Sequence, residues 1–261
     1  RFRNVTGVQT CALPISAPAD GYTMIVATSA VMAIRTTLLK EKTYDAQKDF
    51  IPIALYVKSP FILVVNPALP IHSVPELIKY VKERPGQLSY SSSGVGGAPH
   101  LSGEYMKKRF GLDLAHVPYR NSPQSISDVA AGHVAMAFAE AGASLPLIKE
   151  GKLRALAVSS STRLPSVPDL PPFSEAANAP DFETVSWHVL LAPAGTPKDV
   201  VDKLHGEMVR IMVMPAIRQK IADLGLIPIE VASVEAMQRY IAAENDKWGV
   251  LVRQLGLEGS Q

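Results

Sequence analysis

Apolar residues recur along the chain in short runs, and the segments between many of these runs carry apolar residues at helical spacing. Runs typical of buried strands occupy Met24–Ala27, Ile51–Val57, Phe61–Val65, 88–93, 114–119, 134–140, 153–160 and 185–197. Helices are predicted over 73–86, 101–111, 122–132, 144–151, 198–213, 215–225 and 233–256. Because strands alternate with helices through most of the chain, the pattern predicts an α/β fold built on parallel strands.

Turn and cap residues support several of these boundaries. Ser73 is followed by Pro75 and Glu76, which is typical of a helix start, and Gly86 ends that helix. Residues 161–183 break the alternation with a Pro-rich stretch. Its polarity predicts a meander that lies over the surface rather than in the core.

The first sixteen residues fit none of this pattern. Residues 5–16 read VTGVQTCALPIS, and polar residues, Gly7 and Pro14 interrupt any apolar run. A secretion signal would need a continuous apolar run, and a buried strand tolerates this Gly and Pro poorly. The stretch closely resembles a translated sequencing-library adaptor. We therefore expect 1–16 to be a non-native segment outside the fold, and the natural chain to continue upstream differently.

Charge and composition argue against several classes of binding partner and of chemistry. The chain has 26 basic and 24 acidic residues, and without Arg1 and Arg3 the two numbers are equal. A neutral chain argues against nucleic acid or an anionic membrane as partner. The single cysteine, Cys11, lies in the adaptor-like stretch, so the remaining chain has no thiol for a disulfide, a nucleophile or a metal site. No apolar run approaches the roughly 18–20 residues that span a bilayer.

Six segments in order resemble a known family. They are DGYTMIVATS, DFIPIALYVKSPFILVVNP, GQLSYSSSGVGGAPHLSGE, HVPYRNSPQSISDVAAGHVAMAF, GKLRALAVSS and SWHVLLAPAGTP. Over essentially all of 17–257 the chain is similar to the Bug-type solute receptors of tripartite tricarboxylate transporters. The resemblance implies a type II periplasmic binding-protein fold, in which two α/β lobes joined by two crossing strands close on a small carboxylate.

The resemblance also implies a domain layout. The crossings fall near Phe61–Val65 and Trp187–Leu191. One lobe combines 17–65 with 188–261, and the other is 66–187. Two departures concern the ligand site: the family's first strand and its Gly/Pro-rich loop are missing from 1–16, and Ala135 and Ala139 stand where the family often has acidic residues.

A Ser- and Gly-rich loop is the first candidate for ligand binding. Ser91–His100 (SSSGVGGAPH) connects a strand to a helix, which would leave backbone N–H groups and a helix N-terminus to bind a carboxylate or phosphate. It lacks the Lys of a nucleotide-binding P-loop. An ordinary flexible loop is the alternative.

Other candidates lie at strand ends. Thr28 and Ser29 either cap a helix or face the ligand. Tyr119 either enters the cleft or packs on the core, and Arg120 is expected in solvent. Glu140 would repel an anionic ligand and would matter only if the ligand carries an amino group. The residues expected at the ligand are Thr28, Ser29, Ala30, Ser92, Ser93, Gly94, Gly96, Gly97, His100, Tyr119 and Glu140.

Four side chains in or near these segments need a separate interpretation. His100 and Glu104 share one helix face, but a zinc site would need a third protein ligand. We interpret Trp187 as core packing and leave the role of His188 open.

No catalytic triad, carboxylate pair or metal cluster stands out, so we expect no enzyme, no cofactor and no metal. The leading hypothesis is a monomeric periplasmic receptor that captures an organic acid or amino acid by lobe closure and presents it to the membrane components of a transporter. The alternative is the cytoplasmic effector-binding domain of a transcriptional regulator.

Overall fold

The computed structural model describes residues 3–4, 17–41 and 44–261, and it divides into two compact units. Unit 1 comprises 1–58, 186–221 and 228–261, and unit 2 comprises 59–185 and 222–227. Two long strands, β3 (Phe50–Val65) and β8 (Val185–Pro193), contribute residues to both units. The crossings inferred from the resemblance lie in these two strands. The lobe boundaries expected from the resemblance are at 65/66 and 187/188, whereas the compact units divide at 58/59 and 185/186.

The strand β3 is longer than the apolar pattern suggests. The two runs on either side of Lys58–Pro60 form one strand of 16 residues. Pro60 has no N–H to donate, but the pairing of β3 with β6 begins at Phe61 and its pairing with β7 begins at Ile62. The strand therefore continues through a residue that usually interrupts one.

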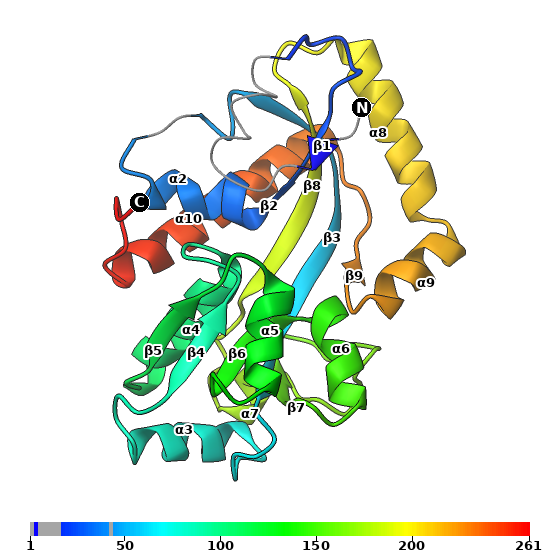
Figure 1. Ribbon diagram of the computed structural model, residues 1–261. Helices are drawn as coiled ribbons and strands as arrows, with labels where there is room; N and C mark the ends of the chain where they lie inside the picture. The colour runs from blue at the N-terminus through cyan, green and yellow to red at the C-terminus, as the bar shows by residue number, and fades with distance from the viewer. Residues whose placement is uncertain (1–2, 5–16, 42–43) are drawn as a thin grey trace. The chain divides into compact units, whose positions relative to one another are not determined.

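Unit 2 is built on a mixed sheet (Figure 1). The strands β4 (Ser89–Ser92), β5 (Ala115–Pro118) and β6 (Met136–Glu140) are mutually parallel, whereas β3 runs antiparallel to β6 and to β7 (Arg154–Val158). The predicted parallel arrangement therefore holds for β4, β5 and β6, whereas β3, which is shared with unit 1, runs in the opposite direction.

Four helices follow these strands in unit 2: α3 (Val74–Lys82), α4 (Ala98–Phe110), α5 (Ser122–Ala130) and α6 (Ala141–Lys149). The cap predicted for the first of them is present, because the Ser73 side chain accepts a hydrogen bond from the Glu76 N–H at 3.3 Å. The helix α4 begins three residues before its predicted start, since Pro99 is compatible with a first helical turn.

The Pro-rich stretch 161–183 lies over the surface for most of its residues, as predicted, but it also contributes side chains to the core. It contains the short helix α7 (Phe173–Ala176), and Leu164, Phe173 and Phe182 are buried within unit 2. The rings of Phe173 and Phe182 pack with centroids 4.0 Å apart. The prediction missed these core residues because it rested on the average polarity of the segment. The two large aromatic side chains within the segment gain most by burial.

In unit 1, β2 (Ile25–Thr28) pairs antiparallel with β8 and leads into the π-helical turn η1 (Ala30–Ile34) and α2 (Arg35–Leu38). The C-terminal part supplies α8 (Lys198–Met212), α9 (Pro215–Asp223), β9 (Ile227–Pro228) and α10 (Val234–Gln254), and α9 and β9 extend into unit 2. The long helix α10 lies beside η1 and α2 (Figure 1).

Both tryptophans of the chain lie in the core of unit 1. Trp187 and Trp248 are fully buried, as expected for Trp187, and their indole N–H groups donate to the same Glu244 oxygen at 2.8 and 3.1 Å. The other carboxylate oxygen, Glu244 Oε1, lies 3.6 Å from Lys247 Nζ, so the charge of this buried group is satisfied by the two indole N–H groups and by a lysine.

Two residues before Ala17 take part in the sheet. Arg3–Asn4 form β1, which pairs in parallel with Ile25 and Val26 of β2. The expectation that 1–16 pair with no strand is therefore wrong for these two residues. The adaptor-like residues 5–16 lie outside the part that the structure describes.

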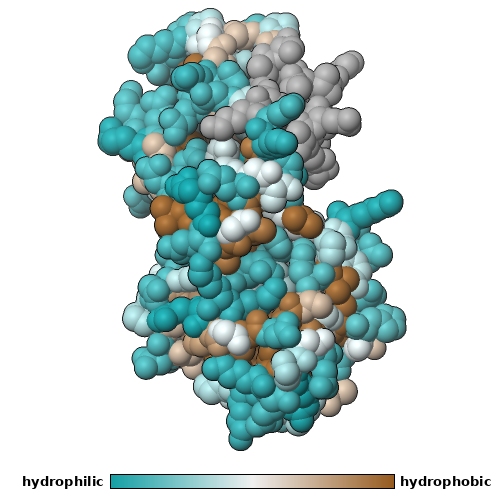
Figure 2. Space-filling model, turned by 90° about the vertical axis from the view of Figure 1, so that its left-hand side faces the viewer, coloured by the Kyte–Doolittle hydropathy of each residue, from teal (hydrophilic) through white to brown (hydrophobic). Residues whose placement is uncertain are grey.

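On the face drawn in Figure 2 the described surface is mostly hydrophilic, and the apolar residues form separate groups. Among the described helices, none combines the length and the apolar character that crossing a membrane requires.

Candidate functional site

Three helices begin at one edge of the sheet in unit 2. Because β4, β5 and β6 are parallel, their carboxyl ends share this edge, and α4, α5 and α6 start directly after them. The first N–H groups of a helix have no intrahelical acceptor, and the helix dipole makes that end positive. In α/β sheets, ligands bind at the carboxyl ends of the strands. This carboxyl edge is therefore suited to an anion.

The loop Ser92–Gly97 leads from β4 into α4 and is closed by its own hydrogen bonds. The Ser92 hydroxyl accepts from the Gly94 N–H at 3.2 Å and donates to the Gly94 carbonyl at 3.1 Å. The Gly96 N–H donates to His100 Nδ1 at 3.2 Å. The sequence suggested that the glycine N–H groups are free for a ligand, but those of Gly94 and Gly96 already have acceptors.

Two glycines are required by the backbone of this loop. Gly94 has φ of 129° and Gly96 has φ of 77°, a region that other residues rarely adopt. The loop can therefore turn tightly before α4 only with glycine at these two positions.

The start of α4 leaves donors for a ligand. The first intrahelical bond runs from the Leu101 N–H to the Gly97 carbonyl at 3.1 Å, so the Ala98 and His100 N–H groups precede the hydrogen-bonded helix. Ser93 is half-buried in the same loop. These groups are neutral donors for a carboxylate.

Two histidines lie beneath this loop. The His100 and His116 rings have centroids 4.2 Å apart, and His116 Nε2 is 2.8 Å from the Ser92 hydroxyl. Burial, more than any nearby charge, lowers the pKa of His100. Burial, followed by the neighbouring His100, lowers the pKa of His116 to about 4. Both rings are therefore neutral near pH 7.

The charged groups beside the histidines pair with each other. Glu104 Oε1 accepts from the Tyr90 hydroxyl at 2.7 Å and from Lys107 Nζ at 2.7 Å. Burial alone would raise the pKa of Glu104, but the bonds from Lys107 and Tyr90 outweigh burial and lower it. Among the described residues, no three His, Cys, Asp or Glu side chains gather as metal ligands.

Tyr119 is held by its own unit rather than left free for a ligand. Its ring packs against the unit 2 core, and its hydroxyl donates to Asp128 Oδ2 at 2.6 Å. Burial, and then Asp128, raises the pKa of Tyr119 to about 12. Arg120 next to it is exposed, as expected.

Glu140 ends β6 at the same edge. It pairs with Phe61 across the sheet and precedes the first residue of α6. Burial raises the pKa of its carboxyl group, and a hydrogen bond with the Ser122 side chain acts in the opposite direction. Ser122 opens α5, whose cap is the Asn121 side chain accepting from the Gln124 N–H at 2.9 Å. We did not single out Asn121 and Ser122 in the sequence, although Asn two residues before Pro123 is typical of a helix start.

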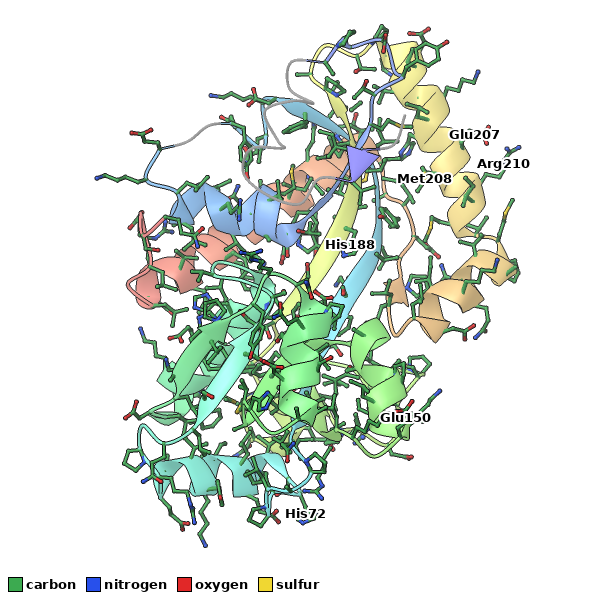
Figure 3. The ribbon with its side chains drawn as sticks, in the orientation of Figure 1. His72, Glu150, His188, Glu207, Met208 and Arg210 are labelled. Atoms are coloured by element: carbon green, nitrogen blue, oxygen red, sulfur yellow. The ribbon has the colours of Figure 1, made fainter. Side chains whose placement is uncertain are left out.

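Thr28, Ser29 and Ala30 belong to unit 1, so the structure does not bring them together with the unit 2 candidates within one compact unit. The Ser29 side chain makes no cap bond, and its hydroxyl lies 2.9 Å from that of the buried Ser186. Thr28 pairs with His188 of β8. Burial lowers the pKa of this histidine, which is labelled on β8 in Figure 3.

Comparison with known proteins identifies the family. Residues 4–257 match the tripartite tricarboxylate transporter family receptor. The chain belongs to this family. It is 31% identical over 249 residues to a protein encoded between tcbD and tcbE in Pseudomonas sp. strain P51, which covers 95% of this chain and 74% of that protein. It is 30% identical to protein BugT of Bordetella pertussis, over 91% of this chain and 73% of BugT.

Solved structures agree with this assignment and with the expected periplasmic binding-protein fold. R. palustris Rpa4515 with adipate gives a TM-score of 0.89 at 33% identity, covering 94% of this chain and 82% of that one. The periplasmic binding protein BugD gives 0.87 at 29% identity, covering 96% and 83%. MatC of Rhodopseudomonas palustris with bound malate gives 0.82 at 26% identity, covering 93% and 83%. The members of this receptor family are solute-binding proteins rather than enzymes.

Proposed function

We propose that this receptor is periplasmic and monomeric, that it binds a small organic acid, and that it presents the acid to the membrane components of a tripartite transporter. The carboxylate of the ligand binds at the carboxyl edge of β4, β5 and β6 in unit 2. Family membership favours this function over the effector-binding domain of a regulator. Two structural relatives, Rpa4515 and MatC, hold adipate and malate respectively.

The observation that carries the proposal is the convergence of three helix starts on that edge. The starts of α4, α5 and α6 each bring a partial positive charge to this edge, and at α4 the Ala98 and His100 N–H groups precede the first intrahelical bond. The donors at the loop are neutral, namely the Ser93 hydroxyl and the N–H groups of Ala98 and His100. We therefore infer that the carboxylate is held by neutral donors, with water completing its shell, rather than by an arginine fork.

Thr28, Ser29 and Ala30 of unit 1 stay in the proposal as further ligand residues, on the strength of the resemblance. Thr28 is half-buried at the end of β2, whereas the Ser29 hydroxyl already has Ser186 as a partner. Thr28 is accordingly the stronger candidate of the two for a side-chain contact.

Calorimetric titration tests the proposal. Adipate, malate, succinate, aspartate and benzoate are titrated into the wild-type chain and into Ser93→Ala and Arg120→Ala. We expect at least one acid to bind and Ser93→Ala to weaken its binding by about threefold to tenfold, since one net hydrogen bond is lost. Arg120→Ala is the matched control, because Arg120 is exposed, and should bind as the wild type does.

Two results would contradict the proposal. If none of the acids binds, the carboxylate function is wrong. If Arg120→Ala abolishes binding while Ser93→Ala leaves it unchanged, the ligand is held by a charged side chain and not by the loop.

A further inference from the structure

We propose that His100 and His116 are positioning residues, which hold the loop Ser92–Gly97 in the form that presents its remaining donors to a bound carboxylate. The inference rests on the proposed function for its ligand. It assigns to the two imidazoles the role of neutral hydrogen-bonding partners of the loop rather than of cations that attract the anion.

The first contact fixes the C-terminal half of the loop. The Gly96 N–H donates to His100 Nδ1 at 3.2 Å, and His100 is nearly fully buried in the first turn of α4. An imidazole nitrogen accepts only when it carries no proton, so a neutral His100 bears its proton on Nε2. Protonation of Nδ1 would remove this acceptor and release Gly96.

The second contact fixes the N-terminal half. His116 Nε2 lies 2.8 Å from the Ser92 hydroxyl, which both accepts from the Gly94 N–H and donates to the Gly94 carbonyl. A hydroxyl has a single proton. When that proton goes to the Gly94 carbonyl, His116 Nε2 must be the donor to Ser92. The neutral Nε2–H form of His116 thus sets the direction of the hydrogen bonds around Gly94.

The packing of the rings explains why both stay neutral. Their centroids are 4.2 Å apart, and the Tyr90 ring stacks on His116 at 4.9 Å. Two charged rings at this separation would repel each other in a poorly solvated site. The other titratable groups that face them are Glu104 and Lys107 of α4, which pair with each other, and Tyr90 of β4.

Holding this loop matters because of its glycines. A segment with glycine at 94, 96 and 97 loses much conformational entropy when it is ordered. Contacts that order the loop before the ligand arrives remove that cost from binding, which raises the affinity.

Paired substitutions distinguish the effect of losing a hydrogen bond to the loop from the effects of changing the volume or the charge of the side chain. Asn at 100 offers an acceptor oxygen near the position of Nδ1, and Gln at 116 offers a polar group near that of Nε2, whereas Leu fills similar space without either. The variants are His100→Asn, His100→Leu, His116→Gln and His116→Leu, and circular dichroism checks that each is folded. The probe is whichever of adipate, malate and succinate binds the wild type most tightly.

We expect both Leu variants to raise the Kd of that acid by about tenfold or more, and the Asn and Gln variants to remain within about threefold of the wild type. Hydrogen exchange of the Gly96 amide, measured without ligand, should speed up in His100→Leu and stay slow in His100→Asn. This second readout does not depend on the identity of the ligand.

Three outcomes would overturn the inference. If the Leu variants bind as tightly as the wild type with unchanged exchange at Gly96, the loop needs no imidazole. If the Asn and Gln variants lose as much affinity as the Leu variants, the rings themselves contact the ligand. If no acid binds the wild type at all, the proposed function falls and the ligand part of this inference with it. In that case the exchange data still decide whether His100 holds the loop.

Discussion

Glu140 is an acidic side chain at an edge that is otherwise suited to anions. Its carboxyl group lies where β6 meets α6, its pKa is raised by burial, and the group that opposes the shift is the neutral Ser122 side chain. An ionised Glu140 would repel a ligand carboxylate nearby, whereas a ligand ammonium group would pair with it. The side chain at this position should therefore influence which acids bind.

Glu140→Gln tests that influence with two ligands that differ in one amino group. The wild type should bind aspartate more tightly than succinate. In the variant the ratio of the two affinities should fall by about tenfold, because Gln keeps the shape of the side chain without its charge. Calorimetric titration of both ligands into both proteins measures this ratio. An unchanged ratio of the two affinities would show that Glu140 does not face the ligand.

The strand β4 and the helix α4 hold the two ends of the loop Ser92–Gly97. Tyr90 projects from β4 under α4, where Gly103 lies against its ring: a Cβ added at Gly103 would come within 2.2 Å of Tyr90 Cε2. The glycine thus allows the close approach of helix and strand that places the Tyr90 hydroxyl on Glu104.

Two glycines in helix interiors should respond in opposite ways to the same change. Gly103→Ala should lower the free energy of unfolding by about 1–3 kcal/mol, because the added methyl group overpacks a buried contact. Gly206→Ala in α8 should raise it by about 0.5–1 kcal/mol, since beyond the local helix backbone the added Cβ meets no atom within 4 Å and alanine favours the helix. Urea unfolding measures both changes, and equal effects of the two substitutions would refute this account of Gly103.

The sequence predicts those features of the elements that depend on residues close together in the chain, and it misses those that depend on distant contacts. The Ser73 cap and the order of strands and helices follow from short-range patterns, and so does the strand–loop–helix that carries Ser92 and Ser93. The direction of β3 and the burial of Phe173 depend on contacts with distant residues. So does the closing of the loop by His116, which lies 24 positions from Ser92. A short stretch of sequence does not include both partners of these contacts, so its pattern cannot predict them.

At the scale of the molecule, acid should destabilise the fold through the buried histidines. The folded-state pKa of His116 is about 4, below the ordinary value of 6.5, because burial favours the neutral ring. The unfolded chain therefore takes up a proton at a higher pH than the folded protein does, and stability is lost as the pH falls from about 6.5 through about 4.

Urea unfolding at a series of pH values measures this effect. His116→Gln, which does not titrate, should show a shallower decline over that range than the wild type. A decline of the same steepness in both proteins would assign the acid sensitivity to other groups. His100, whose pKa is also lowered, contributes in the same direction in both proteins.

The shared acceptor of Trp187 and Trp248 makes the chain's intrinsic fluorescence a local signal. The chain has two tryptophans, and both indoles report on the surroundings of Glu244 in unit 1. An acid that touches unit 2 alone would leave their emission unchanged even at saturation. A shift in emission that saturates with the calorimetric Kd would instead mean that unit 1 responds to the ligand. A fluorimeter can thus distinguish capture by one unit from capture that engages both.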